Sequence, residues 1–576
     1  MSFIKDILHS SETLNLENRE NEIFLYPYYS YVQQKISSVV PNDTIMGKSN
    51  HINSLTYQIV SYAYENYFKF VYPYEYRLAK NNNYLSGDTD KEQNRDFVVN
   101  LSSEEEWIEY LFEKYPKLLY MLETYTNGII LYLKKFLSSL QKDYQLLNSF
   151  FKLENSGVDE IQLFKGDLHN EECVSSVSFS NGVKLYYKPR CAANEKFLSD
   201  VIDLLRGMGW DVKLGIPKYI DGCSYSWHLH ISPKEMTNRD SIKDYYENLG
   251  KLQGLFYLLG SQDVIPDNVF CIAGCTYLID CESILTKPYR YKDSSKLSMY
   301  LQESVIRTGI LPDWMFSNAN ERNKISSVLF KFDDKNCHLP KVNGASVEIA
   351  SDTLQYFENG FEEACNFFIA HNVEIFNFLN SYNPLRITER VLLHPTVIYT
   401  LILREMVTPP YLHGTENIKK LIEPIVREES FGSERSRIIE SISDQIESGN
   451  VPFFYTMSVD PSLYTLPHKT VIKNWISKNC EAFYSIKKRL QSLNRKRENE
   501  QISIIDESVN FFLDVKDRRQ KEKRILPTDG NVLDGQSIME AIERIDKEIQ
   551  NRMIDVDEEL GFVCRTKNGS VPIVRG

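Results

Sequence analysis

The chain has 576 residues, 42% of them hydrophobic and 25% charged, which is an ordinary balance for a large globular protein. The net charge is −13 and no strong basic patch interrupts it, so we expect no nucleic acid partner. The start of the chain has no signal-peptide core, and no window approaches the about 18 apolar residues of a membrane span. The ten cysteines lack paired spacing. We therefore expect a cytoplasmic protein with reduced thiols.

The first 155 residues are predicted to be mostly helical. Ser103 and Glu106 form a candidate capping box before Trp107, and Pro116 should separate two helices, since its ring cannot continue the first one. This region carries no obvious chemistry.

Residues 42–49, NDTIMGKS, end like a phosphate-binding P-loop. Asn42 stands where that motif has its first Gly, and a side chain disfavours the tight turn that wraps backbone N–H groups around phosphate. We therefore expect no nucleotide site in this segment.

The pattern changes to strands from residue 165 onward. Two β-rich runs, 174–179 and 183–187, flank Ser180-Asn181-Gly182, and Asn-Gly is favoured in tight hairpins. Lys188 follows the second run directly. A Lys on a strand suits contact with nucleotide phosphates in a kinase, and the alternative is a surface Lys at a strand end.

Histidines occur at two places where a metal site must be considered. His228 and His230 alternate in the run 224–231, which we expect to be a strand with both rings on one face. Two His do not make a metal site, and Cys337-His338 lacks the CxxC partner of a zinc site. We favour ordinary structural roles for all four residues.

The remaining elements follow from apolar periodicity. The segment ERVLLHPTVIY, residues 389–399, is expected to be a strand or extended run as far as Pro395-Thr396. Helical segments are predicted, in chain order, over 194–207, 241–260, parts of 299–385, 400–495 and 537–553.

The most informative stretch is QDVIPDNVFCIAGCTYLIDCESIL, residues 262–285. Asp263 lies five residues before Asn268, and Asp280 ends a short apolar run further on. Phosphoryl transfer from ATP needs one Asp to accept or orient the nucleophile's proton, and an Asn and a second Asp to hold metal ions on the phosphates. Protein kinases space their catalytic Asp and metal-binding Asn in the same way. The alternative is that these are turn residues.

Taken in order, these pieces resemble the dehydratase domain of the class II lanthipeptide synthetases, the LanM family, from about residue 100 to 562. The segments that carry the resemblance are GDLH (166–169), YKPR (187–190), D-x4-N followed by IDCE (263–282), SVIRTGILP (304–312), RVLLHPT (390–396) and GNVPFFYT (449–456).

The resemblance implies an α+β fold with a lipid-kinase-type, bilobal catalytic core and extra helical elements at both ends. A full synthetase of the family also carries a C-terminal zinc cyclase domain, which we expect this chain to lack, since its tail has only Cys564 and no His among possible zinc ligands of that kind. The expected domains are an N-terminal helical region (1–155), a β-rich small lobe (156–235), a large lobe with an elimination segment (236–495) and a helical tail (496–576).

The resemblance also implies a reaction. The family phosphorylates Ser and Thr of a precursor peptide and eliminates the phosphate, leaving dehydroalanine or dehydrobutyrine. Phosphate, whose second pKa is about 6, leaves far more readily than hydroxide. The implied cofactors are ATP and Mg²⁺. The implied partners are a precursor peptide with a leader and a Ser/Thr-containing core, and a separate cyclase or export protein.

Residue roles carry over by position. Asp263 matches the family's phosphorylation Asp. The expected cofactor-binding residues are Lys188, Arg190, Asn268 and Asp280, and the expected metal ligands are Asn268, Asp280 and Glu282.

The elimination residues of the family match Asp167, His169, Arg390 and Thr396. Arg390 would grip the phosphate bidentately. His169 is expected to be the proton shuttle, since the pKa of an imidazole lies near neutrality.

The chain departs from the family at Ile265, where the family has a His, and Asp267 replaces a Glu. An Ile cannot carry a proton, so phosphorylation is expected to be slow or to use an altered geometry. Two other interpretations stay open. One is a kinase of a peptide or small molecule that does not eliminate phosphate. The other is a catalytically impaired scaffold that binds a peptide.

Overall fold

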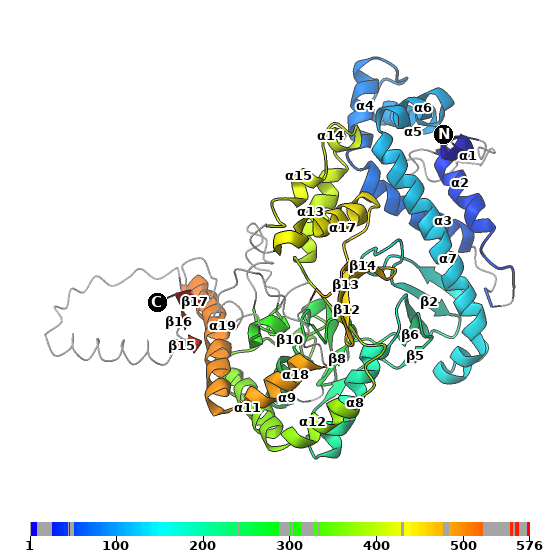
Figure 1. Cartoon of the computed structure of the whole chain (residues 1–576). Helices are drawn as coiled ribbons and strands as arrows, with labels where there is room; N and C mark the ends of the chain where they lie inside the picture. The colour runs from blue at the N-terminus through cyan, green and yellow to red at the C-terminus, as the bar shows by residue number, and fades with distance from the viewer. Residues whose placement is uncertain are drawn as a thin grey trace.

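The computed structural model describes residues 2–8, 26–43, 45–46, 51–236, 238, 241–286, 300, 303–312, 327–331, 335–427, 431–475, 483–521, 553–556, 559–563 and 573–575. The fold is α+β, mostly helical with several small sheets (Figure 1). Over these residues no helix is long and apolar enough to cross a membrane.

Helices make up every element described before residue 155. They are α1 (Ser2–Leu8), α2 (Tyr26–Ser37), α3 (His51–Ala63), η1 (Tyr64–Phe68), α4 (Val71–Asn81), α5 (Asp90–Val99), η2 (Leu101–Ser103), α6 (Glu105–Lys114) and α7 (Pro116–Phe151). Pro116 opens α7, as predicted, because a missing N–H costs nothing at the first turn of a helix.

The predicted capping box at Ser103 and Glu106 is wrong. Glu104 occupies the N-cap of α6 and makes no side-chain cap, since Ser103 is the last residue of η2. A true capping box lies at α5, where the Thr89 hydroxyl accepts from the Glu92 backbone N–H and the Glu92 carboxylate accepts from that of Thr89.

A five-stranded antiparallel sheet follows the helices, in the order β1-β2-β3-β6-β5. Its strands are β1 (Val158–Gln162), β2 (Ser175–Phe179), β3 (Lys184–Lys188), β5 (Tyr219–Asp221) and β6 (Ser226–Leu229). The predicted hairpin is confirmed, with Gly182 at φ +85° between β2 and β3.

The long helix α7 packs against this sheet (Figure 1). Phe136 lies 5.0 Å from the ring of Tyr187 and 5.9 Å from that of Trp227. Asp143 accepts hydrogen bonds from the Trp227 indole N–H and the Tyr225 hydroxyl. These contacts fix the sheet on the helix and orient the ends of β3 and β6.

A second group of elements surrounds the central stretch of the sequence. A three-stranded sheet of order β4-β8-β7 shares one buried hydrophobic cluster with helices α8, α9 and α11. The elements of this group, in chain order, are α8 (Ala193–Gly207), β4 (Leu214–Gly215), α9 (Ser241–Leu259), η3 (Pro266–Asn268), β7 (Val269–Ile272), β8 (Cys275–Leu278), η4 (Val305–Thr308), β9 (Lys341–Val342), β10 (Ala345–Ser346), α11 (Ser351–Ala370) and α12 (Asn372–Ser381).

Helices α9 and α11 cross at a pair of glycines. A Cβ on Gly250 would lie 1.9 Å from the Phe357 carbonyl oxygen, and one on Gly360 equally close to that of Glu247. Only glycine permits this backbone approach.

The prediction that helices fill 400–495 is wrong in part. Strands β12 (Phe454–Met457), β13 (Asp460–Thr465) and β14 (Lys469–Ile472) join β11 (Thr388–Arg390) in an antiparallel sheet. The extended run is also shorter than predicted, since β11 ends at Arg390 and a helix begins at Thr396. Helices near and after this sheet are α13 (Thr396–Met406), α14 (Pro409–Leu412), α15 (Lys419–Ile422), η5 (Gly432–Glu434), α17 (Arg435–Glu447), α18 (Tyr484–Ser492) and α19 (Arg495–Lys521).

The tail ends in a small sheet of β15 (Met553–Val556), β16 (Glu559–Val563) and β17 (Ile573–Arg575). The helix predicted over 537–553 lies outside the described residues, except for Met553, which belongs to β15.

The buried hydrophobic residues fall into two clusters. One joins the N-terminal helices, the five-stranded sheet and the segment from Val391 to Ile472. The other joins α8, α9, α11, α18 and α19 with the β7–β8 hairpin. The predicted site residues lie where these two clusters meet.

Candidate functional site

Lys188 ends β3, opposite Ser226 of β6, and is only 8% exposed. Its Nζ donates a hydrogen bond to the Ile279 carbonyl at 2.7 Å and lies 3.7 Å from Oδ1 of Asp280. The alternative of a surface lysine at a strand end is therefore excluded. The strand instead delivers a buried ammonium to the end of β8.

Arg190 is held between two carboxylates. Its NH1 and NH2 donate to Glu195 at 3.0 and 2.8 Å, and NH2 also donates to Oδ1 of Asp280 at 2.7 Å. Glu195 is 1% exposed and lies in the first turn of α8. The sequence analysis missed Glu195, although a Glu in the first turn of the helix after a strand-borne Lys was a usable signal.

Asp280 is ionised despite its enclosure. Burial alone would raise the pKa of this carboxyl, but the charges of Lys188 and Arg190 hold the pKa well below its usual range. The backbone N–H of Glu282 also donates to Oδ1 at 3.0 Å. The carboxylate thus faces two cations and a backbone dipole.

Asp263 and Asn268 are brought together by η3. The Asn268 amide donates to the Asp263 carbonyl at 2.9 Å and to its Oδ2 at 3.3 Å. Asp263 has φ +61°, a left-handed conformation that the Asn268 contact supports. Ile265 is half-buried, and its side chain lies 3.1 Å from where a Cβ on Gly309 would be, so this neighbour of Asp263 is apolar.

The pKa of Asp263 is raised to about 7 by partial enclosure and by the negative charges of Asp280 and Glu282. Its side chain still reaches solvent. Three carboxyl groups therefore share one electrostatic environment at the open side of the site.

Arg390 reaches this cluster from β11. A parallel β-bridge between Thr286 and Arg390 sets β11 beside the segment after β8. NH1 of Arg390 lies 3.5 Å from Oε1 of Glu282. Burial raises the pKa of Glu282, an effect that the charge of Arg390 opposes.

The guanidinium of Arg390 has unused donors. It stacks 3.4 Å above the ring of Phe453 and is 4% exposed, yet its Nε has no hydrogen-bond acceptor and its NH1 has only the 3.5 Å ion pair with Glu282. Buried donors without acceptors are costly, so such a group is suited to an incoming anion. The sequence analysis did not single out Phe453, which lies in the GNVPFFYT segment.

His169 lies beside the same guanidinium. Its Nδ1–H donates to the Val451 carbonyl at 2.7 Å, which leaves Nε2 as an acceptor, and its ring packs edge-on against Phe453 at 5.1 Å. Burial and the charge of Arg390 lower the pKa of His169 to about 4. The expectation of a pKa near neutrality is wrong, and this imidazole is neutral at pH 7.

The other two predicted elimination residues are less tightly placed. Asp167 is exposed, and its negative charge acts on His169. Thr396 is half-buried at the start of α13. Among the residues that the structure describes, no hydrogen bond ties either side chain to the cluster.

His228 lies behind Lys188, and the sequence analysis treated it as an ordinary strand residue. Its Nε2 is 2.9 Å from the Ser226 hydroxyl, and burial together with the charge of Lys188 lowers its pKa to about 3. The imidazole is neutral and part of the wall of the site.

The structure does not support the zinc candidate at Cys337-His338, and it describes the P-loop-like segment only in part. His338 is buried and its Nε2–H donates to the Phe330 carbonyl, and no cluster of three or more His, Cys, Asp or Glu suited to a metal occurs in the described part of the chain. Residues 44 and 47–49 of the P-loop-like segment lie outside the described residues.

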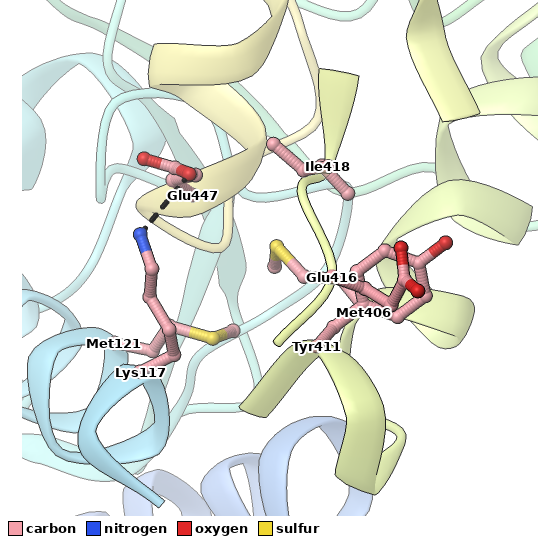
Figure 2. Close-up of a pocket in the computed structure, with 7 residues that line it drawn as sticks. All are labelled: Lys117, Met121, Met406, Tyr411, Glu416, Ile418 and Glu447. Carbon is pink, nitrogen blue, oxygen red and sulfur yellow. Dashed lines mark hydrogen bonds and ion pairs between the residues drawn. The ribbon is translucent and has the colours of Figure 1, made fainter. Parts of the chain in front are cut away.

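A cavity between α7, α13, α14 and α17 is also excluded as a site (Figure 2). It measures about 20 Å³ and is bordered by the ion pair of Lys117 with Glu447. That space holds a water molecule at most.

The family comparison matches residues 115–338 and 330–457 to a domain of unknown function, DUF4135. The chain belongs to this family. The recognition of the class II lanthipeptide synthetase dehydratase domain from the sequence is thereby confirmed.

One similar protein is the "Lacticin 481/lactococcin biosynthesis protein LcnDR2" of Lactococcus lactis subsp. lactis, which is 23% identical over 420 residues. The match covers 66% of this chain and 45% of that protein. This chain therefore spans less than half the length of its relative.

Proposed function

We propose that the chain dehydrates Ser and Thr residues of a ribosomal precursor peptide, by phosphorylation with ATP and then elimination of phosphate. Membership of the dehydratase family supports a role in lanthipeptide biosynthesis. The observation that carries the proposal is the contact of Glu282 with Arg390, which joins the predicted phosphorylation residues to the predicted elimination residues.

A kinase-like core is supported by the order of elements. Strands β1 to β3 of the five-stranded antiparallel sheet precede helix α8 and β5 and β6 follow it, a buried Lys ends β3, and this Lys lies beside the Asp that follows β8. Two separate hydrophobic clusters meeting at the site fit a bilobal core. In protein kinases a Lys on a strand of the small lobe forms an ion pair with a Glu on the following helix. Here Glu195 of α8 is the helix Glu, and its partner is Arg190 and not Lys188.

The donor set suits Mg²⁺. Oxygen ligands are available from Asn268, Asp280 and Glu282. The pKa of Asp263 is raised by burial and also by the negative charges of Asp280 and Glu282, which a divalent cation would offset. When bound, Mg²⁺ neutralises charge on the phosphates of ATP. Arg190 would then position Asp280 for the metal. The other hydrogen bonds of Arg190, to Glu195 and to the Cys191 carbonyl, hold its guanidinium in place.

In the first half-reaction, the Asp263 carboxylate accepts the proton of the substrate hydroxyl. The hydroxyl oxygen bonds to the γ-phosphorus of ATP while the bond from that phosphorus to ADP breaks. Lys188, at the end of β3, contacts the phosphates. Asn268 holds Asp263 in place through its amide.

In the second half-reaction, the unused donors of Arg390 bind the phosphate of the phosphopeptide. The neutral His169 accepts the α-proton through Nε2 as the Cα=Cβ bond forms and the Cβ–O bond breaks, releasing phosphate. Asp167 stabilises the imidazolium by its charge, and Thr396 provides a hydroxyl near the start of α13.

The test is intact mass spectrometry of the precursor peptide encoded beside this chain, after incubation with the protein, ATP and Mg²⁺. Successive losses of water are expected. Phosphate adducts that persist would reduce the function to that of a kinase, and an unchanged mass with a bound peptide would indicate a scaffold. A separate cyclase or export protein would be the next partner.

A further inference from the structure

A cavity of about 420 Å³ lies on the outer face of α8, away from the ionic cluster. Its lining comes from α8, the end of α7 and the segment from β4 to β5. The residues are Phe150, Ser199, Ile202, Asp203, Arg206, Leu214, Ile216, Pro217, Lys218 and Tyr219. Ligand pockets in proteins commonly measure about 300–1,000 Å³, so this space is large enough for several side-chain groups.

The lining is apolar at its base and charged at its rim. Ile202 and Leu214 are buried, whereas the charged residues Asp203, Arg206 and Lys218 are exposed. The Arg206 guanidinium donates to the Val212 and Leu214 carbonyls. A ligand with an apolar side chain and a polar backbone matches an apolar base with a polar rim.

The surface continues beyond the cavity in two directions. Phe150 and Leu146 are 48% and 51% exposed and lie one turn apart on α7, which extends the apolar lining into a strip. Strand β5 is at the edge of its sheet and pairs only with β6 among the described strands. An extended peptide can add to such an edge while its side chains fill adjacent pockets.

The cavity is also connected to the ionic cluster. Ser199 lies one turn from Glu195 on α8 and lines the cavity together with Tyr219. The Tyr219 ring stacks on His228 at 5.8 Å. A ligand in the cavity therefore contacts the back of the helix that holds Arg190 through Glu195.

We propose that this cavity docks an extended segment of the peptide substrate, distinct from its reacting Ser or Thr, with an apolar side chain against Ile202 and Leu214. The proposal rests on the proposed function for the identity of the peptide. A small metabolite would leave the strip of Leu146 and Phe150 and the edge of β5 uncovered, which is why a peptide fits better.

The experiment measures fluorescence anisotropy of the labelled precursor peptide with the full chain, in parallel with dehydration of that peptide. Phe150→Asp places a charge on the apolar strip, and Ile216→Trp fills the cavity from a half-buried position. The matched control is Leu131→Asp, also on α7 and 56% exposed. It lies about 28 Å from Phe150 along the helix axis.

Both cavity variants should weaken peptide binding by about tenfold or more and raise KM, with the control unchanged. Circular dichroism and ATP binding equal to those of the wild type would show that the variants fold. Binding within twofold of the wild type for both variants, or no binding of the peptide to any protein, would overturn the docking proposal. If the variants bind the peptide more weakly but the wild type does not dehydrate it, the docking site stands and the proposed function is rejected. If the wild type dehydrates the peptide and neither variant changes that dehydration, the proposed function stands and the docking site is rejected.

Discussion

NH1 of Arg390, on β11, lies 3.5 Å from Oε1 of Glu282, in the turn after β8. The two residues belong to different predicted half-reactions, so a phosphorylated side chain need not travel far between them. The same guanidinium has no hydrogen-bond acceptor for its Nε, only this ion pair for its NH1, and a stacking partner in Phe453.

Replacing Arg390 should separate the two half-reactions. Arg390→Ala removes the group proposed to bind the departing phosphate, and loss of one such donor commonly costs about 10²–10³-fold in rate. Phosphopeptide should therefore accumulate. Arg390→Lys should restore little, since an ammonium cannot form the bidentate contact.

The measurement is the ratio of phosphopeptide to dehydrated peptide by mass spectrometry, with Arg404→Ala on the exposed side of α13 as the control. An Arg390→Ala variant that forms dehydrated peptide at the wild-type rate would contradict the assignment.

Local spacing predicted the parts of the site that are local in the chain. Asn268 contacts Asp263, five residues away, and Lys188 ends the second strand of a hairpin set by Asn181-Gly182. The α+β fold and the segments that carry the chemistry were also recoverable, since recognisable short motifs mark them.

Contacts between distant segments were not predictable from spacing. Arg190 and Asp280 are 90 residues apart, and His169 and Val451 are 282 apart. Glu195 and Phe453 have roles that depend on such contacts. The sheet of β12 to β14 was missed because its strands are short and polar in places, and tertiary pairing with β11 decides their conformation.

The phosphorylation rate should depend on the ionisation of Asp263. Its pKa of about 7 means that the carboxylate, the form able to accept a proton, is only part of the population at neutral pH. The single-turnover rate should rise between about pH 6 and pH 8. More Mg²⁺ should shift this rise to lower pH, because a nearby cation favours the carboxylate.

Quenched-flow measurement of phosphopeptide formation provides the test. A rate that does not change over this pH range, in a protein that still binds ATP, would show that Asp263 is not the titrating base.

The same ionisation predicts how stability varies with pH. The pKa of Asp263 is raised to about 7 in the folded protein and is about 3.9 in an unfolded chain, so the folded state holds a proton that the unfolded state releases between these values. The contribution of Asp263 to stability is therefore lost as the pH rises through this window. Asp263→Asn should raise Tm relative to the wild type, and by more at about pH 8 than at about pH 5.

Thermal unfolding followed by circular dichroism, without Mg²⁺, measures this difference. The exposed Asp159→Asn is the control and should show no such dependence on pH. An equal difference in Tm at both pH values would contradict the electrostatic explanation.

Glu195→Gln should change the response to Mg²⁺. Glu195 is buried and shares Arg190 with Asp280, so its neutralisation leaves Asp280 as the main counter-charge of Arg190. The proposed metal must then compete with a tighter Arg190–Asp280 pair, and half-maximal phosphorylation should need more Mg²⁺. Loss of a buried charged hydrogen bond should also destabilise the fold by roughly 1–3 kcal/mol.

The control is Lys196→Gln, which removes an exposed ion pair with Asp200 in the same turn of α8. Such pairs contribute about 0.3–0.5 kcal/mol, so little change is expected. Titration of Mg²⁺ at saturating ATP separates the roles of Glu195. If Glu195→Gln lowers Tm but leaves the Mg²⁺ midpoint unchanged, Glu195 only stabilises α8, and the positioning of Asp280 does not depend on it.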